Sequence, residues 1–198
     1  MLSNAGGLVG TTMRTQVARR MFTTDEFHRM ATAGILAEDD RVELIEGEIV
    51  CMSPIGSPHA ASVDRLAALL IRRLGRRANV RIQGPIVLGR HSEPQPDVTV
   101  LKPREDFYAT EHPGPKDVLL LIEVADTSGA YNRGTKLPLY ARSGIREVWI
   151  VDVVERTLEA YRRPTLRGYR ERRELSLKQN VAPVAFPRTR LRVGDIVG

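Results

Sequence analysis

Acidic side chains stand beside apolar, strand-like runs at three places in this sequence. Asp97 directly precedes the run VTVL, Glu123 ends the run LLLI, and Glu43 lies within the run VELI. An unpaired charge in such a run is costly to bury, so each carboxylate needs a compensating partner. Lys136, one of only four lysines in the chain, opens the amphipathic segment that follows Glu123.

Carboxylates at matching ends of neighbouring strands would form a site for a hard divalent cation. Neighbouring strands lie about 4.8 Å apart, so such carboxylates repel one another and raise one another's pKa values. A divalent cation removes that penalty, and Mg²⁺ prefers one or two carboxylates together with water and phosphate oxygens. A metal held there would activate a water and stabilise charge on a phosphate. A lysine alongside supplies a compact positive charge for that water or phosphate.

The first half of the chain predicts the elements that must position these residues. Thr23 and Glu26 form a capping-box pattern before a first helix that ends near Gly34. Glu46–Gly47 predicts the turn of a hairpin whose first strand carries Glu43. An amphipathic helix is predicted over residues 57–78, and strands are predicted over 80–89, 95–102 and 117–125.

The second half predicts a loop over residues 126–134 and a short helix over 135–144, with Pro138 in its first turn. Lys136 would then lie in the first helical turn and could point back over the preceding strand. Strands follow at 146–153 and 157–163, and residues 168–198 predict short edge strands and loops. Because residues 117–125 are apolar on both faces, we predict an α/β (α+β) domain with a central mixed β-sheet flanked by helices.

Composition and charge bound the possible functions. Net charge is +6, which tolerates a polyanionic partner without demanding one. The chain has no GxGxxG or P-loop, so we expect no nucleotide cofactor, and no apolar run approaches the ~20 residues of a membrane span. Cys51 is the only cysteine, so an internal disulfide is excluded and we expect a cytoplasmic protein. Its place in a strand-like run indicates a small hydrophobic residue of that strand. We expect residues 1–20 to form a flexible N-terminal segment and residues 21–198 a single domain.

The histidines fall into two groups. His59 starts the helix over 57–78, where it could contact the site or a substrate phosphate, or simply be a polar residue of the first turn. His28, His91 and His112 show no metal-ligand spacing and are expected at the surface. Without a cysteine pair or a histidine pair, the sequence predicts no zinc site.

These motifs, taken in order, resemble the Uma2 family of restriction endonuclease-like proteins, within the PD-(D/E)xK nuclease superfamily. The resemblance covers roughly residues 22–165 and rests on three segments. The run from Glu123 to Asp152 is the most specific of them. The segments read RVELIEGEIVCMSP, QPDVTVL and LLIEVADTS…YNRGTKLPLYARSGIREVWIVD.

The resemblance implies a restriction endonuclease-like core with an acidic metal site at one end of the sheet. Asp97 and Glu123 would be metal ligands, with the backbone carbonyl of Val124 as a third and Glu43 assisting. The resemblance also implies that Lys136, on the next helix, replaces the lysine that the superfamily usually carries two residues after the glutamate. The implied cofactor is Mg²⁺, with Mn²⁺ as a substitute.

The sequence departs from the family pattern at two positions that bear on activity. Ala125 stands where the usual lysine would be, and Asn132 stands where family members often have aspartate. From the residues alone, Glu123 fits a salt bridge to a buried arginine as well as a metal site, and Asp97 also fits a strand-start residue. Glu43 equally fits an exposed hairpin charge, and Lys136 also fits a solvated helix position.

The sequence therefore predicts a metal-dependent endonuclease that hydrolyses phosphodiester bonds of nucleic acid, with DNA as the expected partner. The catalytic set would be Glu43, Asp97, Glu123 and Lys136. Because cutting two strands suits two-fold symmetry, we expect a homodimer. The alternative is a catalytically silent module that keeps the nuclease fold and serves in nucleic-acid binding or homodimeric assembly.

Overall fold

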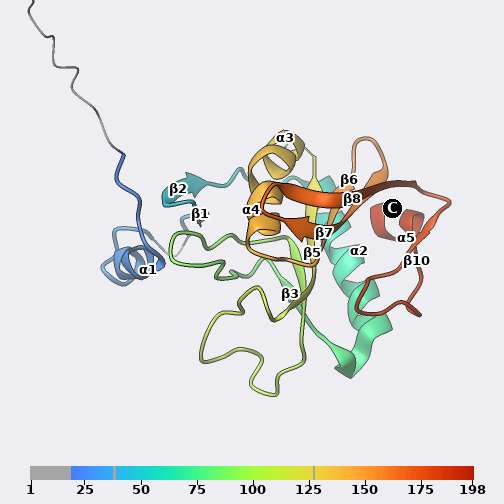
Figure 1. The fold of residues 1–198 in the computed structure, drawn as a ribbon, viewed down its shortest axis with the longest axis horizontal. Coiled ribbons are helices and arrows are strands. Elements are labelled where there is room, and N and C mark those ends of the chain that lie inside the picture. Colours follow the sequence, from blue (N-terminus) through green and yellow to red (C-terminus); the bar gives the residue numbers. More distant parts are fainter. Residues whose placement is uncertain (1–18, 38, 127) are drawn as a thin grey trace, which may run out of the picture.

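The computed structural model describes residues 19–37, 39–126 and 128–198. Its centre is a six-stranded mixed sheet of order β3-β4-β5-β6-β7-β8 (Figure 1). The β5–β6 pair is parallel and the other neighbouring pairs are antiparallel. The strands are β3 (Asn79–Ile82), β4 (Val98–Leu101), β5 (Val118–Ala125), β6 (Glu147–Asp152), β7 (Thr157–Thr165) and β8 (Gly168–Ser176). The predicted mixed sheet with flanking helices is confirmed, and β5 lies inside it as expected.

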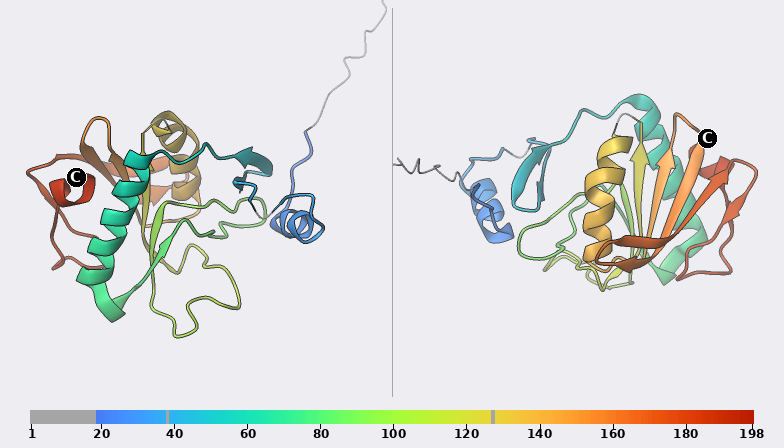
Figure 2. Two further views of the ribbon diagram at one scale, coloured as in Figure 1. Left: turned by 180° about the vertical axis from the view of Figure 1, so that it is seen from behind. Right: turned by 45° about the horizontal axis from the view of Figure 1, so that its top comes forward.

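Helices cover both faces of this sheet. The long helix α2 (Ser57–Leu74) lies on one face, and the helical segment that contains α4 (Leu137–Arg142) lies on the other (Figure 2). Alternate residues of β5 join the two cores: Ile122 and Val124 pack on the α2 side, whereas Leu121 packs on the α4 side with Tyr140. This two-residue period directs Glu123 towards the α4 face of the sheet.

The parallel β5–β6 connection is one helical segment with an irregular middle. It comprises α3 (Gly129–Tyr131), a π-helical stretch (Asn132–Lys136) and α4. The predicted loop over 126–134 is therefore wrong in its second half, and Lys136 lies inside the segment rather than in its first turn. The π stretch directly precedes α4, where Pro138 has no N–H to donate to the carbonyl four residues earlier.

The N-terminal part of the described chain forms a separate unit beside the main sheet. Helix α1 (Thr24–Thr32) has the predicted capping box between Thr23 and Glu26. Strands β1 (Val42–Ile45) and β2 (Glu48–Cys51) pair as the predicted hairpin, with Glu46 and Gly47 at positive φ in its turn. This two-stranded sheet and α1 lie at the end of the molecule away from the C-terminus (Figure 1).

The remaining elements close the α2 face near the C-terminus. A short 3-10 turn (Gly75–Arg77) follows α2, and β9 (Asn180–Val181) pairs with β10 (Leu191–Arg192) before α5 (Val193–Val197). Within the described ranges, no helix is both long and apolar enough to cross a membrane. Most of the segment expected to be flexible, residues 1–18, lies outside the described residues.

The structure corrects two sequence predictions about the extent of strands and one about the burial of Cys51. The predicted strand over 80–89 ends at Ile82, because Gln83 takes a positive φ of 46° that breaks the extended backbone. Strand β8 is nine residues long, not a short edge strand, because it pairs along most of β7. Cys51 lies at the exposed end of β2 and is not packed as a hydrophobic residue.

Candidate active site

A pocket of about 320 Å³ opens beside the carboxyl end of β5. It brings together side chains from the hairpin, α2, the start of β4, β5 and the segment before α4. All five side chains that the sequence analysis proposed for the site line it: Glu43, His59, Asp97, Glu123 and Lys136.

Asp97 is fixed by the register of the sheet and by two donors. Val98 pairs with Ile122 in the antiparallel β4–β5 ladder, so the preceding Asp97 lies opposite Glu123. The backbone N–H of Val124 donates to Asp97 Oδ2 at 2.8 Å, and His59 Nε2 lies 2.9 Å from Oδ1. Asp97 thus directly precedes β4, and its side chain also lines the pocket.

His59 reaches this carboxylate from the first turn of α2 and is buried. Its hydrogen bond to Asp97 raises the pKa of His59 above its ordinary value, although burial acts in the opposite direction. Of the two alternatives for His59, the structure supports contact with the site. The imidazole contacts one oxygen of the Asp97 carboxylate and orients it.

Glu123 is buried on the α4 side of the sheet, with 3 % of its surface exposed. Tyr140 Oη donates to its Oε1 at 2.5 Å, and Lys136 Nζ lies 3.3 Å from the same oxygen. Burial raises the pKa of Glu123 to about 7, and the nearby Lys136 charge only partly offsets that effect. Its ion-pair partner is therefore a lysine and not the buried arginine that the sequence left open.

Glu43 is also buried, which excludes an exposed hairpin charge. Lys136 Nζ donates to Glu43 Oε1 at 2.8 Å, and the backbone N–H of Gln95 donates to the same oxygen at 2.9 Å. Burial lowers the pKa of Lys136, but the charges of Glu123 and Glu43 outweigh burial and raise it. One ammonium thus lies between two carboxylates that come from strands distant in the sequence, β1 and β5.

The π-helical stretch explains how Lys136 reaches this position. In a π-helix the backbone bonds span five residues instead of four, which changes the direction of the side chains that follow relative to a regular α-helix. Asn132 and Lys136 are both buried and both line the pocket. Tyr140, one turn further on, continues this row of side chains to Glu123.

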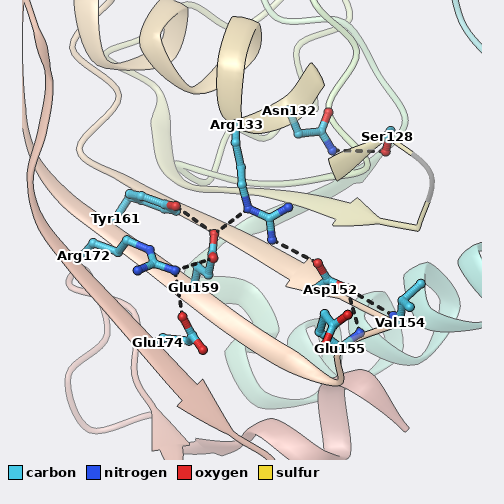
Figure 3. A network of polar contacts seen from close by, with 10 residues as sticks. All are labelled: Ser128, Asn132, Arg133, Asp152, Val154, Glu155, Glu159, Tyr161, Arg172 and Glu174. Atoms are coloured by element: carbon cyan, nitrogen blue, oxygen red, sulfur yellow. Dashed lines mark hydrogen bonds and ion pairs between the residues drawn. The ribbon is translucent and has the colours of Figure 1, made fainter. Parts of the chain in front are cut away.

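An ion-pair network fixes the other side of the same stretch (Figure 3). Arg133 points away from Asn132 and reaches Asp152 on β6 and Glu159 on β7, each at 3.0 Å. Tyr161 and Arg172 also hold Glu159, each at 2.7 Å. Arg133 therefore ties the π stretch to two strands, and the sequence analysis did not identify this anchor.

The donor set suits a hard divalent cation. The pocket holds carboxylates from Glu43, Asp97 and Glu123, and Mg²⁺ requires only one or two of them besides water. Asp126 also lines the pocket, so four carboxylates outnumber the one lysine ammonium and acidic charge remains for a cation.

The arrangement of sheet, helices and acidic pocket is that of a nuclease-type fold. The chain belongs to the Uma2 family, described as "Putative restriction endonuclease", whose sequence profile matches residues 24–194.

A solved structure shares the fold. It is titled "a putative nuclease belonging to DUF820", from Anabaena variabilis ATCC 29413, and aligns with a TM-score of 0.69 at 20 % identity. The alignment covers 89 % of this chain and 97 % of the other. No curated protein matches the sequence.

Proposed function

We propose that this protein is a metal-dependent endonuclease that hydrolyses phosphodiester bonds in DNA at the pocket beside β5. The observation that carries the proposal is the convergence of the Glu43, Asp97 and Glu123 carboxylates with the buried Lys136 on a single pocket in a chain of the Uma2 family. Mg²⁺ is the proposed cofactor, with Mn²⁺ as a substitute.

In this proposal Asp97 and Glu123 hold the metal, the Val124 carbonyl supports them, and Glu43 assists from the hairpin. Bound there, Mg²⁺ would lower the pKa of a water ligand and offset charge on the scissile phosphate. His59 and the Val124 N–H keep the Asp97 carboxylate oriented. Lys136, held between Glu43 and Glu123, directs its ammonium charge to the attacking water or the phosphate.

Arginine supplies the charge that DNA would need. Arg41 lines the mouth of the pocket, with its guanidinium 3.0 Å from the Ser53 carbonyl, and is exposed to solvent. The net charge of +6 adds a sequence-independent attraction to phosphate. A homodimer would present two such pockets to the two strands, and sedimentation equilibrium measures that state directly.

The test is cleavage of supercoiled plasmid DNA with Mg²⁺ by wild type, Asp97→Asn and Glu48→Gln. Glu48 is an exposed carboxylate on the same hairpin as Glu43 and serves as the matched control. Wild type and Glu48→Gln are expected to nick and linearise DNA, and Asp97→Asn is expected to lose at least about a hundredfold in rate. Cleavage by Asp97→Asn at the wild-type rate would overturn the proposal.

A second candidate is a silent nucleic-acid-binding module, and one observation favours it. The Lys136 ammonium already compensates Glu43 and Glu123, so the pocket is partly neutralised without a metal. Such a module would bind DNA with an affinity that falls steeply with salt and would cleave none of it, with or without divalent cation.

A further inference from the structure

A second cluster of potential ligands lies outside the pocket described above. His28 is on α1, Glu93 is in the segment between β3 and β4, and His112 is in the loop between β4 and β5. One nitrogen from each histidine and one oxygen from Glu93 all lie within 4.8 Å of one another. In residues 19–37, 39–126 and 128–198, this is the one group of three such residues that converges so closely. The sequence analysis excluded zinc, because residues so distant in sequence show no ligand spacing.

Burial of Glu93 indicates that the cluster needs a cation. Only 5 % of the Glu93 side chain is exposed, and His28 Nε2 lies 2.7 Å from its Oε2. Its backbone is fixed as well, since it exchanges two hydrogen bonds with Leu44 on β1. His28 is half exposed and compensates the carboxylate fully only when it is protonated. The His112 ring meets that of His28 edge to face, at 6.1 Å between centroids, and brings a further nitrogen to the same place.

We propose that His28, Glu93 and His112 bind a transition-metal cation of the Zn²⁺ class, with water as the remaining ligand. Two imidazoles and one carboxylate form a donor set that zinc uses, whereas Mg²⁺ favours oxygen ligands. Ligand bonds of about 2.0–2.2 Å in a tetrahedron bring ligand atoms to roughly 3.4 Å from one another. The three atoms already lie within 4.8 Å of one another, so small rotations of the two exposed histidines about the fixed Glu93 would reach that spacing.

The bound ion would add a direct link between three segments that single backbone hydrogen bonds already connect, from Thr24 to Arg90 and from Val87 to Pro113. It would fasten α1 and the loop over 102–117 to the segment that carries Glu93. Glu93 pairs with Leu44, the residue after Glu43, and Gln95 in the same segment donates to the Glu43 carboxylate. The proposed ion would therefore be a structural metal that stabilises the segment next to the pocket. This proposal does not depend on whether the protein cleaves DNA.

The test is calorimetric titration of Zn²⁺ alone into the full chain after treatment with a chelator. The variants are His28→Ala and His112→Ala, and the control is His91→Ala, since His91 bonds the Phe22 carbonyl and lies outside the cluster. Wild type and the control are expected to bind one equivalent, and each ligand variant is expected to bind at least about tenfold more weakly. Because His28 and His112 are exposed, we expect both alanine variants to fold, and the fluorescence of buried Trp149 checks their folding.

A second readout separates this cluster from the carboxylate pocket. Co²⁺ substituted for Zn²⁺ is expected to give the visible absorption of a four-coordinate, imidazole-ligated site in wild type and in Glu123→Gln, and to lose it in His112→Ala. Two results would overturn the proposal. One is the absence of Zn²⁺ binding to wild type, and the other is stoichiometric binding that both histidine variants retain.

Discussion

Replacing Lys136 by methionine would remove the cation that compensates two buried carboxylates. The Lys136 ammonium lies 2.8 Å from Glu43 and 3.3 Å from Glu123, and none of the three side chains is more than 7 % exposed. Methionine keeps most of the apolar stem, so the change removes charge with little loss of packing. The perturbation therefore isolates the electrostatic part of the site.

The expected cost follows from burial and depends on pH. Removing one partner of a buried ion pair typically costs about 3–5 kcal/mol, and we expect that loss at pH 8. At pH 5 Glu123, with a pKa of about 7, already holds a proton in the wild type, and the abandoned Glu43 carboxyl group can take one up instead of staying charged. With an unfolded-state glutamate pKa near 4.3 and 1.36 kcal/mol per pH unit, protonation then costs only about 1 kcal/mol. The loss should therefore shrink to about 2 kcal/mol or less.

Urea denaturation followed by tryptophan fluorescence measures this loss, because Trp149 is the single tryptophan and is fully buried. The matched control is Lys178→Met, at an exposed lysine, which should change stability by less than about 0.5 kcal/mol. A loss for Lys136→Met that is the same at pH 5 and pH 8, or that matches the control, would refute the account of Lys136 as the compensating cation.

Three further predictions test the surroundings of the site. In metal-free protein, the free energy of unfolding should fall by about 3 kcal/mol between pH 4.5 and pH 7, because burial raises the pKa of Glu123 from 4.5 to about 7 and the folded state therefore binds the proton more tightly. Urea titrations should show this fall for the wild type and not for Glu123→Gln. Arg133→Met should cost about 1–3 kcal/mol in the same assay, and Arg133→Lys should restore only part, since one ammonium cannot replace a guanidinium that holds two carboxylates. Gly47→Ala should lower the melting temperature more than Gly34→Ala: both have positive φ, worth about 1–2 kcal/mol, but only at Gly47 would the new Cβ lie 2.6 Å from a Met21 carbon.

Local sequence signals predicted much of this fold because they act over few residues. The Thr23–Glu26 capping box, the Glu46–Gly47 turn and the apolar stripe of α2 each depend on neighbours in the chain, and the structure has all three. The apolar run over residues 118–122 of β5 predicted an interior strand because a strand covered on both faces needs apolar residues on both.

What the sequence could not predict depends on contacts between distant segments. The helical segment begins at Gly129 rather than after residue 134, because Arg133 ties the π stretch to strands β6 and β7 that come later in the chain. Likewise, sheet pairing and loop paths bring His28 to His112, although their spacing in sequence carries no such signal. Tyr140 lies in the core, and its hydroxyl group also donates to the Glu123 carboxylate. Its position four residues after Lys136 was the available signal.

The central claim is that Asp97 and Glu123 hold a divalent cation for phosphodiester hydrolysis. The most direct measurement is calorimetric titration of Mn²⁺ into protein saturated with a short DNA duplex of non-hydrolysable linkages, so that phosphate oxygens are available to the metal. Wild type and Glu48→Gln are expected to bind Mn²⁺, and Asp97→Asn and Glu123→Gln to bind it at least about tenfold more weakly. Equal binding by all four proteins would contradict the account.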